Sequence, residues 1–218
     1  MLPTLGDLLP YAIPVALSPL PVIAVVMLLL APAGTRGGLG FLAGRVAALA
    51  AVAFAVALLA GRLARESGGA DRGAWIRIAL GCLLIAGAWL VWRRGPAEPS
   101  VPGWLRALDG AAPAGALRLG ALLTVANPKE LAFVAGAGTI IGAAAPPAGQ
   151  ALALALVFAA IAALGVAAPL AWAAASGAAA RARLAALRDG LVRHQALIMA
   201  AILVLIGTML VGSGLKAL

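Results

Sequence analysis

Two charged residues and a proline interrupt an apolar stretch that is long enough to cross a membrane. The stretch runs from about Leu119 to Gly142, and Asn127-Pro128-Lys129-Glu130 lies inside it. Each charge at bilayer depth costs about 2.5–3.5 kcal/mol on insertion scales, so such groups persist where they face protein or a water-filled cavity. Lys129 and Glu130 are therefore candidates for a site within the membrane.

A second interrupted segment, Ser18-Pro19-Leu20-Pro21, lies inside another apolar span, 109 positions upstream of Asn127-Pro128. Paired interruptions in two halves of a chain indicate the binding site of a secondary transporter. Ser18 and Asn127 are natural N-caps for the half-helices that follow them, and the N-terminus of a half-helix favours an anion. We expect the two segments to form facing sides of one site near the middle of the membrane.

Each proline also frees a backbone carbonyl one turn earlier, because it has no N–H to donate. Pro19 and Pro21 free the carbonyls near Val15 and Leu17, and Pro128 frees one near Thr124. These carbonyls add polarity to the site without adding charge. The alternative is a simple proline kink, which would require neither Lys129 nor Glu130.

Arg45 is the other charged residue within an apolar span. Lys129 and Glu130 are neighbours in the sequence and point about 100° apart on a helix, so they pair poorly with each other. A Glu130–Arg45 pair would neutralise both charges and leave Lys129 as the cation of a cavity. Alternatively, Arg45 extends to the membrane surface. The predicted substrate-binding residues are Ser18, Pro19, Pro21, Arg45, Asn127, Pro128, Lys129 and Glu130.

Other kinds of chemistry have little support in the sequence. The single cysteine, Cys82, permits no intrachain disulfide and no multi-cysteine metal site, and the single histidine, His194, has no nearby ligands. We find no nucleophile–base constellation and no phosphate-binding glycine loop. We therefore expect no enzyme activity, no catalytic residue, no metal and no cofactor.

The composition predicts an all-α integral membrane protein, because 64% of its 218 residues are hydrophobic and 11% are charged. A membrane β-barrel would instead show short alternating segments. Six stretches are near or above the roughly 20 residues that cross a bilayer as a helix. The expected spans are Leu8–Ala31, Leu39–Leu59, Trp75–Trp92, Ala116–Gly142, Leu152–Ala175 and Leu191–Val211.

The clearest linker, around Arg93–Ser100, divides the chain into two halves. We predict a first three-helix repeat at residues 1–93, a linker at 94–114 and a second three-helix repeat at 115–218. The linker contains a short amphipathic helix around Val101–Leu108, which either lies on the membrane surface or packs on the bundle. Because each repeat has three spans, the second inserts upside down relative to the first, with proline-broken helices 1 and 4.

Most arginines lie in the gaps between spans, so the net charge of +9 indicates membrane orientation and not binding of nucleic acid. The bias predicts that both termini are external to the cytoplasmic (inner) membrane. The sequence also contains small-xxx-small motifs at Gly40–Gly44 and Gly138–Gly142. These motifs favour close helix packing within the bundle over a dedicated dimer seam.

The chain resembles the actinobacterial peptidoglycolipid-addressing proteins, called GAP or Sap, within the lysine exporter superfamily. The matching segments are Pro14 to Pro21, Gly40-Phe41-Leu42-Ala43-Gly44-Arg45 and Asn127-Pro128-Lys129-Glu130-Leu131. The resemblance implies six helices in two inverted repeats, with helices 1 and 4 facing each other. It also implies export of small molecules, or movement of glycolipids or phospholipid-like molecules towards the cell envelope.

Three functions follow as hypotheses. The first is a transporter or flippase for an anionic amphiphile, a lipid or glycolipid, whose headgroup meets Lys129 and Arg45. The second is a proton-coupled exporter of a small polar solute such as an amino acid, with Glu130 as the proton carrier. The third is a non-transporting assembly factor for a lipid-export machine. Membrane lipids are the expected partners, while a homodimer and lipid-export partner proteins stay open.

Overall fold

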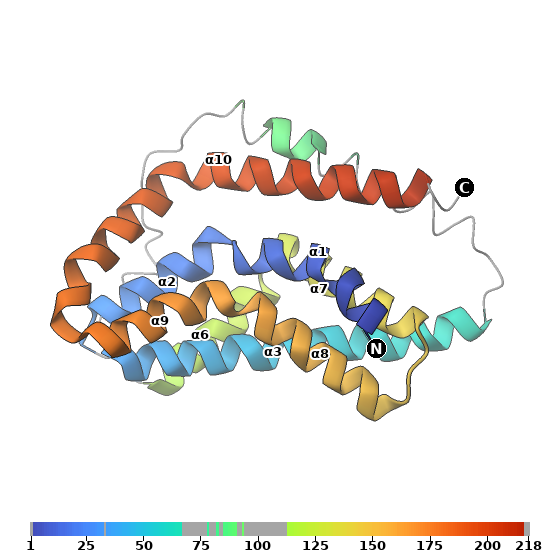
Figure 1. The fold of residues 1–218 in the computed structure, drawn as a ribbon, viewed down its shortest axis with the longest axis horizontal. Coiled ribbons are helices and arrows are strands. Elements are labelled where there is room, and N and C mark those ends of the chain that lie inside the picture. Colours follow the sequence, from blue (N-terminus) through green and yellow to red (C-terminus); the bar gives the residue numbers. More distant parts are fainter. Residues whose placement is uncertain are drawn as a thin grey trace.

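In a computed structural model, every described element is helical (Figure 1). The structure describes residues 2–32, 34–66, 78, 82, 85–90, 93 and 113–215. Most of the predicted third span, Trp75–Trp92, lies outside these residues. Nearly all of the predicted linker at 94–114, with its amphipathic helix, lies outside them as well.

The predicted first span is a bent pair of helices, α1 (Leu2–Ala16) and α2 (Pro19–Leu30). The two helices are bent by 54° at the break, where Ser18 has an extended backbone. Pro19 begins α2 because a fixed φ suits the first helical position, where the missing N–H has no partner to lose. The break therefore lies where the sequence predicted it.

The predicted fourth span is also broken, into α6 (Pro113–Val125) and α7 (Pro128–Ala143). Asn127 is extended, and Pro128 begins α7 in the same way that Pro19 begins α2. The predicted second span is the continuous helix α3 (Gly34–Glu66). The prediction of proline breaks in helices 1 and 4 is thus confirmed.

The remaining helices are α8 (Ala148–Ala162), α9 (Leu164–Ser176), the 3-10 turn η1 (Gly177–Ala179) and α10 (Ala180–Leu215). The sequence predicted one continuous fifth span, but α8 and α9 are bent by 58° around Ala163. No proline lies at this break, since Pro169 lies inside α9. By length and composition, α3 and α10 qualify as membrane spans, and each bent pair adds one if it crosses as a unit.

The described helices run in both directions along the long axis of the molecule (Figure 1). The α1–α2 pair runs opposite to α6–α7, and α3 runs opposite to α8–α9. Both chain termini lie at the same end, the end that also holds the α7–α8 connection. The directions fit an inverted pair of repeats, while the count of six spans stays a prediction.

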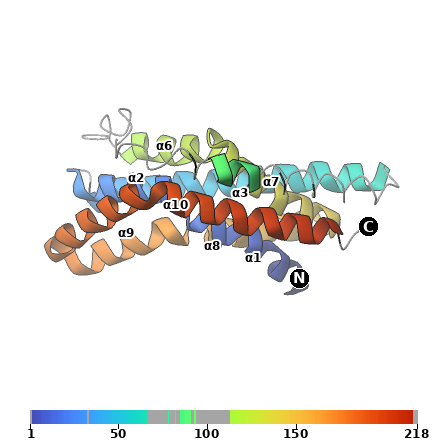
Figure 2. The ribbon, with the colours of Figure 1, turned by 90° about the horizontal axis from the view of Figure 1, so that it is seen from above.

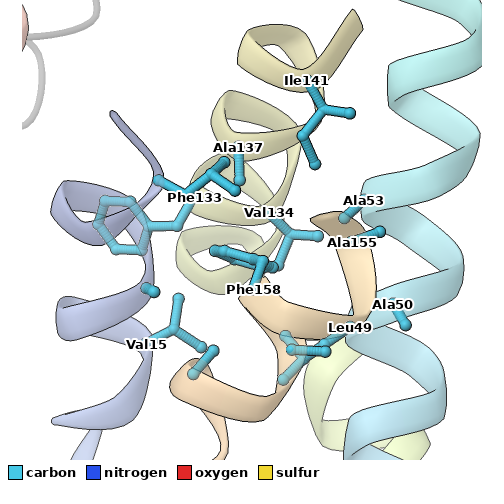
Figure 3. Close-up of a cluster of buried hydrophobic side chains, with 14 of the residues drawn as sticks. Val15, Leu49, Ala50, Ala53, Phe133, Val134, Ala137, Ile141, Ala155 and Phe158 are labelled. Carbon is cyan, nitrogen blue, oxygen red and sulfur yellow. The ribbon is translucent and has the colours of Figure 1, made fainter. Parts of the chain in front are cut away.

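Two apolar clusters fill the bundle, one on each side of the helix breaks. The first combines residues of α1, α3, α7, α8 and α10, including Leu8, Leu49, Phe133, Phe158 and Ile202 (Figure 3). The second combines residues of α2, α3, α6, α9 and α10, including Val25, Phe41, Leu123, Leu170 and Leu184. Along α3 and along each broken pair of helices, the change from one cluster to the other falls at or near the level of the breaks.

Glycines bring α3 into backbone contact with α6 and α7, which lie along it (Figure 2). A Cβ added at Gly44 would meet the carbonyl oxygen of Leu117, and one at Gly120 would meet that of Phe41. At the other end, a Cβ at Gly138 would lie 2.8 Å from the Ala53 carbonyl oxygen. Both small-xxx-small motifs therefore pack within the bundle, as predicted.

Substitution of Gly44 by alanine is expected to destabilise the protein by about 1–3 kcal/mol, because the added methyl meets backbone that cannot turn away. Gly190→Ala is the matched control, since a Cβ there meets nothing within 4 Å. Alanine in an open helical position should be neutral or slightly stabilising. Thermal unfolding in detergent measures both changes. Equal melting temperatures for the two variants would contradict the close approach.

Candidate binding site at the helix breaks

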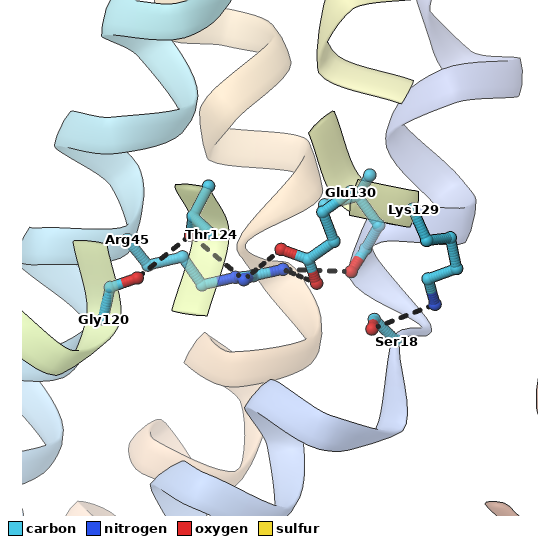
Figure 4. Close-up of polar contacts among 7 residues, drawn as sticks. Ser18, Arg45, Gly120, Thr124, Lys129 and Glu130 are labelled. Atoms are coloured by element: carbon cyan, nitrogen blue, oxygen red, sulfur yellow. Dashed lines mark hydrogen bonds and ion pairs between the residues drawn. The ribbon is translucent and has the colours of Figure 1, made fainter. Parts of the chain in front are cut away.

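A polar layer lies between the two apolar clusters. It consists of Ser18, Arg45, Thr124, Lys129 and Glu130, which come from four places in the chain (Figure 4). The breaks meet at this level, since a Cβ at Gly165, just after the α8–α9 break, would meet the carbonyl oxygen of Ala16 at the end of α1. The layer is thus built where helices are interrupted and backbone polar groups are free.

Arg45 and Glu130 form a buried ion pair in this layer. The Arg45 Nη1 donates to Glu130 Oε2 at 2.8 Å, and Nη2 donates to Oε1 at 3.1 Å. Both side chains have 0% exposure. Two parallel charge-assisted hydrogen bonds give a guanidinium–carboxylate pair its strongest geometry. The predicted pair is confirmed, and the alternative in which Arg45 extends to the surface is wrong.

Arg45 also holds the ends of two other half-helices. Its Nη2 donates to the backbone carbonyl of Val15 at 3.2 Å, and its Nη1 donates to Thr124 Oγ1 at 3.3 Å. The Val15 carbonyl is one that the sequence predicted Pro19 to free. Thr124 in turn donates to the carbonyl of Gly120 at 3.0 Å. One side chain of α3 thereby connects α1, α6 and α7 at their breaks.

Lys129 is the charged residue of the polar layer that does not belong to the Arg45–Glu130 pair. Its side chain is partly buried, and its Nζ donates to Ser18 Oγ at 3.3 Å and to Met199 Sδ of α10 at 3.0 Å. Both partners are uncharged, and a thioether sulfur is a weak acceptor. Within the described part of the chain, Lys129 has no carboxylate that neutralises it directly. Among these residues the pairing of Arg45 with Glu130 thus leaves Lys129 without a carboxylate of its own, as expected, while its role as the cation of a cavity stays a prediction.

The remaining predicted site residues lie at the same level but contribute differently. Ser18, Pro19 and Pro21 are buried, Asn127 is partly buried and Pro128 is exposed. Ser18 and Asn127 occupy N-cap positions, but neither side chain makes a capping hydrogen bond. At Ser18, Pro21 occupies the third helical position and so removes one of the two N–H groups that a serine cap can bind. The Ser18 hydroxyl binds Lys129 instead.

Among the described residues, no group of histidine, cysteine or acidic side chains is arranged to hold a metal ion. The polar layer has one carboxylate, and the guanidinium occupies both of its oxygens. The layer therefore offers an ammonium group, a serine hydroxyl and free backbone groups at the helix breaks. Such a set can bind an anion.

The model of one protein family, described as Sap, sulfolipid-1-addressing protein, matches residues 8–216. The chain belongs to this Sap family. The match covers both proline-broken spans and the whole polar layer, so it confirms the family expected from the sequence. No curated protein and no solved structure matches the chain significantly.

Sequence reasoning missed three residues that build or contact the polar layer. Thr124 drew attention for its carbonyl, but its hydroxyl is what binds Arg45. Gly120 permits the close crossing that brings α6 to Arg45. Met199 carried no signal, because a methionine in an apolar helix is ordinary. The signal for Thr124 was a hydroxyl one turn before Pro128 in an otherwise apolar stretch.

Replacing Thr124 by valine is expected to destabilise this Sap-family protein by about 1–3 kcal/mol, since a buried charged donor loses an acceptor. Thr124→Ser keeps the hydroxyl and is the control. The fraction of monodisperse protein and the melting temperature in detergent measure the effect. If valine and serine behave alike, the hydroxyl does not hold Arg45.

Proposed function

We propose that this protein is a membrane transporter that moves an anionic amphiphile, a lipid or glycolipid, across the cytoplasmic membrane or towards its outer face. The observation that carries the proposal is the environment of Lys129. This cation lies partly buried at the junction of two broken helices, and its hydrogen-bond partners are uncharged. An anionic headgroup would neutralise its charge.

Arg45 has a different role in this proposal from the one that the sequence suggested. Its guanidinium is engaged by Glu130, Thr124 and Val15, so it holds the helix ends and does not meet the headgroup. Glu130 is correspondingly a poor proton carrier, because both its oxygens accept hydrogen bonds from Arg45. The geometry thus favours the amphiphile over the proton-coupled solute.

Two further features support a lipid cargo. The family description names the addressing of a sulfolipid. Large apolar side chains are also exposed on most helices, as expected of surfaces that face lipid. Examples with more than half of their surface exposed are Leu17, Leu39, Leu122, Leu164 and Leu197.

We also propose six spans in two inverted repeats, with both termini outside. The opposite directions of α1–α2 and α6–α7 support the inversion. One end of the bundle holds the starts of α3, α6 and α10, which carry Arg36, Arg118 and Arg181. The opposite end of α3 carries Arg62, so the excess of arginine at the first end supports a cytoplasmic position for that end and an external position for both termini.

The test is headgroup-resolved translocation in proteoliposomes. Purified protein is reconstituted with fluorescent phosphatidylglycerol, fluorescent phosphatidylcholine or a trapped amino acid, and protein-free liposomes give the background. We expect movement of the anionic lipid above that of the zwitterionic lipid, with loss of the difference in Lys129→Ala. Amino-acid efflux driven by a proton gradient would replace the proposal with the solute exporter. Folded protein that moves nothing would favour an assembly factor.

A further inference from the structure

We propose that the anionic group of the cargo binds Lys129 by displacing the sulfur of Met199. We also propose that α10, which carries Met199, moves aside to admit the cargo. The inference rests on the proposed function and specifies how cargo reaches the site. It starts from the contact of 3.0 Å between the Nζ of Lys129 and the Sδ of Met199, which lies in α10.

The two partners of Lys129 differ in how readily they can be replaced. Ser18 belongs to the break between α1 and α2 and is fully buried, so its hydroxyl is fixed in place. Met199 offers a flexible thioether, which is a weak acceptor for an ammonium group. An anionic oxygen that displaced the sulfur would exchange a weak contact for a charge-assisted hydrogen bond. The sulfur side of Lys129 is therefore the side on which cargo binds.

Packing also distinguishes α10 from α3, α6 and α7. Glycine contacts join backbones closely between α3 and α6, between α3 and α7, and between the start of α9 and the end of α1. In α10, a Cβ added at Gly190 or Gly212 would meet nothing within 4 Å. This helix joins the first cluster through larger side chains, namely Ile198, Ile202 and Ile206. Backbones that interlock through glycine separate less easily than helices held by flexible side chains.

The position of α10 fits a wall between the site and the lipid. It packs against α1, α2, α9 and η1, and in Figure 1 it runs along one side of these helices, with the short helical segment at residues 85–90 beyond it. Figure 2 looks onto this side, where α10 crosses in front of the other helices. Its outer surface carries Leu197, Val204 and Leu205, which are 60%, 45% and 52% exposed. A lipid entering from the bilayer can reach Lys129 by moving this helix while the glycine-packed helices keep their arrangement.

The experiment measures two distances between pairs of spin labels, and both pairs include a label on α3. The single native cysteine is first removed by Cys82→Ser. Spin labels at Leu39→Cys and Leu197→Cys report α3 to α10, and labels at Leu39→Cys and Leu156→Cys report α3 to α8. All three positions are exposed leucines. The distances are recorded by electron resonance in nanodiscs of phosphatidylcholine with and without phosphatidylglycerol. We expect the α3–α10 distance to shift by about 5 Å with the anionic lipid, a displacement of one helical turn.

The α3–α8 distance should stay unchanged, and the α3–α10 shift should disappear in Lys129→Ala. Equal shifts in both pairs would overturn the proposal in favour of a motion of the whole bundle. An unmoved α10 in protein that still translocates anionic lipid would overturn it while the proposed function stands. Folded protein that translocates no lipid would overturn both the proposed function and the proposed movement of α10.

Variants of Met199 test the place on Lys129 itself. Met199→Glu puts a carboxylate where the cargo anion is proposed to bind, so translocation of anionic lipid should fall about ten-fold or more. Met199→Gln places a neutral side chain of similar size at the same position, so it should lower translocation much less than Met199→Glu does. The proposal is wrong if Met199→Glu is tolerated, or if Met199→Gln lowers translocation as much as Met199→Glu in protein that remains monodisperse.

Discussion

Replacing Arg45 by methionine is expected to cost about 3–5 kcal/mol, which is enough to remove most of the folded protein from the membrane. The variant leaves the Glu130 carboxylate fully buried without its two hydrogen-bond donors. It also leaves the Val15 carbonyl and the Thr124 hydroxyl without the guanidinium that joins them. The yield of monodisperse protein and the melting temperature in detergent measure the loss.

Glu130→Leu should be similarly damaging, because it leaves a buried guanidinium without its carboxylate. The informative variant is the double one, Arg45→Met with Glu130→Leu, which buries no charge. A buried pair replaced as a whole by apolar groups is often neutral in stability. We expect the double variant to recover most of the yield that either single variant loses. Additive losses would show that the two side chains are not coupled as a pair.

The pair could be predicted because charges are scarce in the apolar spans. Arg45, Lys129 and Glu130 were the candidates, and neighbouring residues on a helix do not pair well, so Arg45 was the partner left for Glu130. The breaks at Ser18 and Asn127 were visible because proline fixes φ and lacks an N–H. The chemistry of individual residues was therefore enough to predict the ion pair and the two proline breaks at the centre of the site.

The break around Ala163 could not be predicted in this way. Its sequence, Ala162-Ala163-Leu164-Gly165, favours a continuous helix apart from the glycine. The bend instead accompanies a tertiary contact, the close approach of Gly165 to the Ala16 carbonyl at the other break. The contact of Lys129 with Met199 was hidden for the same reason, since it depends on where α10 packs and not on any local pattern.

Removing the charge of Lys129 is expected to lower translocation of anionic lipid by about 10- to 150-fold, and to leave the background movement of zwitterionic lipid unchanged. A hydrogen bond to a charged group contributes about 1.5–3 kcal/mol, and each 1.36 kcal/mol corresponds to a factor of about ten in rate. The variants to compare are Lys129→Gln and Lys129→Arg. Arginine keeps the charge, so it should retain most of the selectivity, while glutamine should lose it.

Stability separates this effect from damage to the fold. Lys129 has uncharged partners, so neutralising it removes a charge that is costly at bilayer depth. The melting temperature of Lys129→Gln should therefore equal or exceed that of the wild type, in contrast to the Arg45 and Glu130 variants. Arg193→Gln is the control for net charge, because Arg193 is exposed on α10. If it lowers translocation as much as Lys129→Gln does, general attraction of anionic lipid explains the effect. If Lys129→Gln has no effect in folded protein, Lys129 does not bind the headgroup.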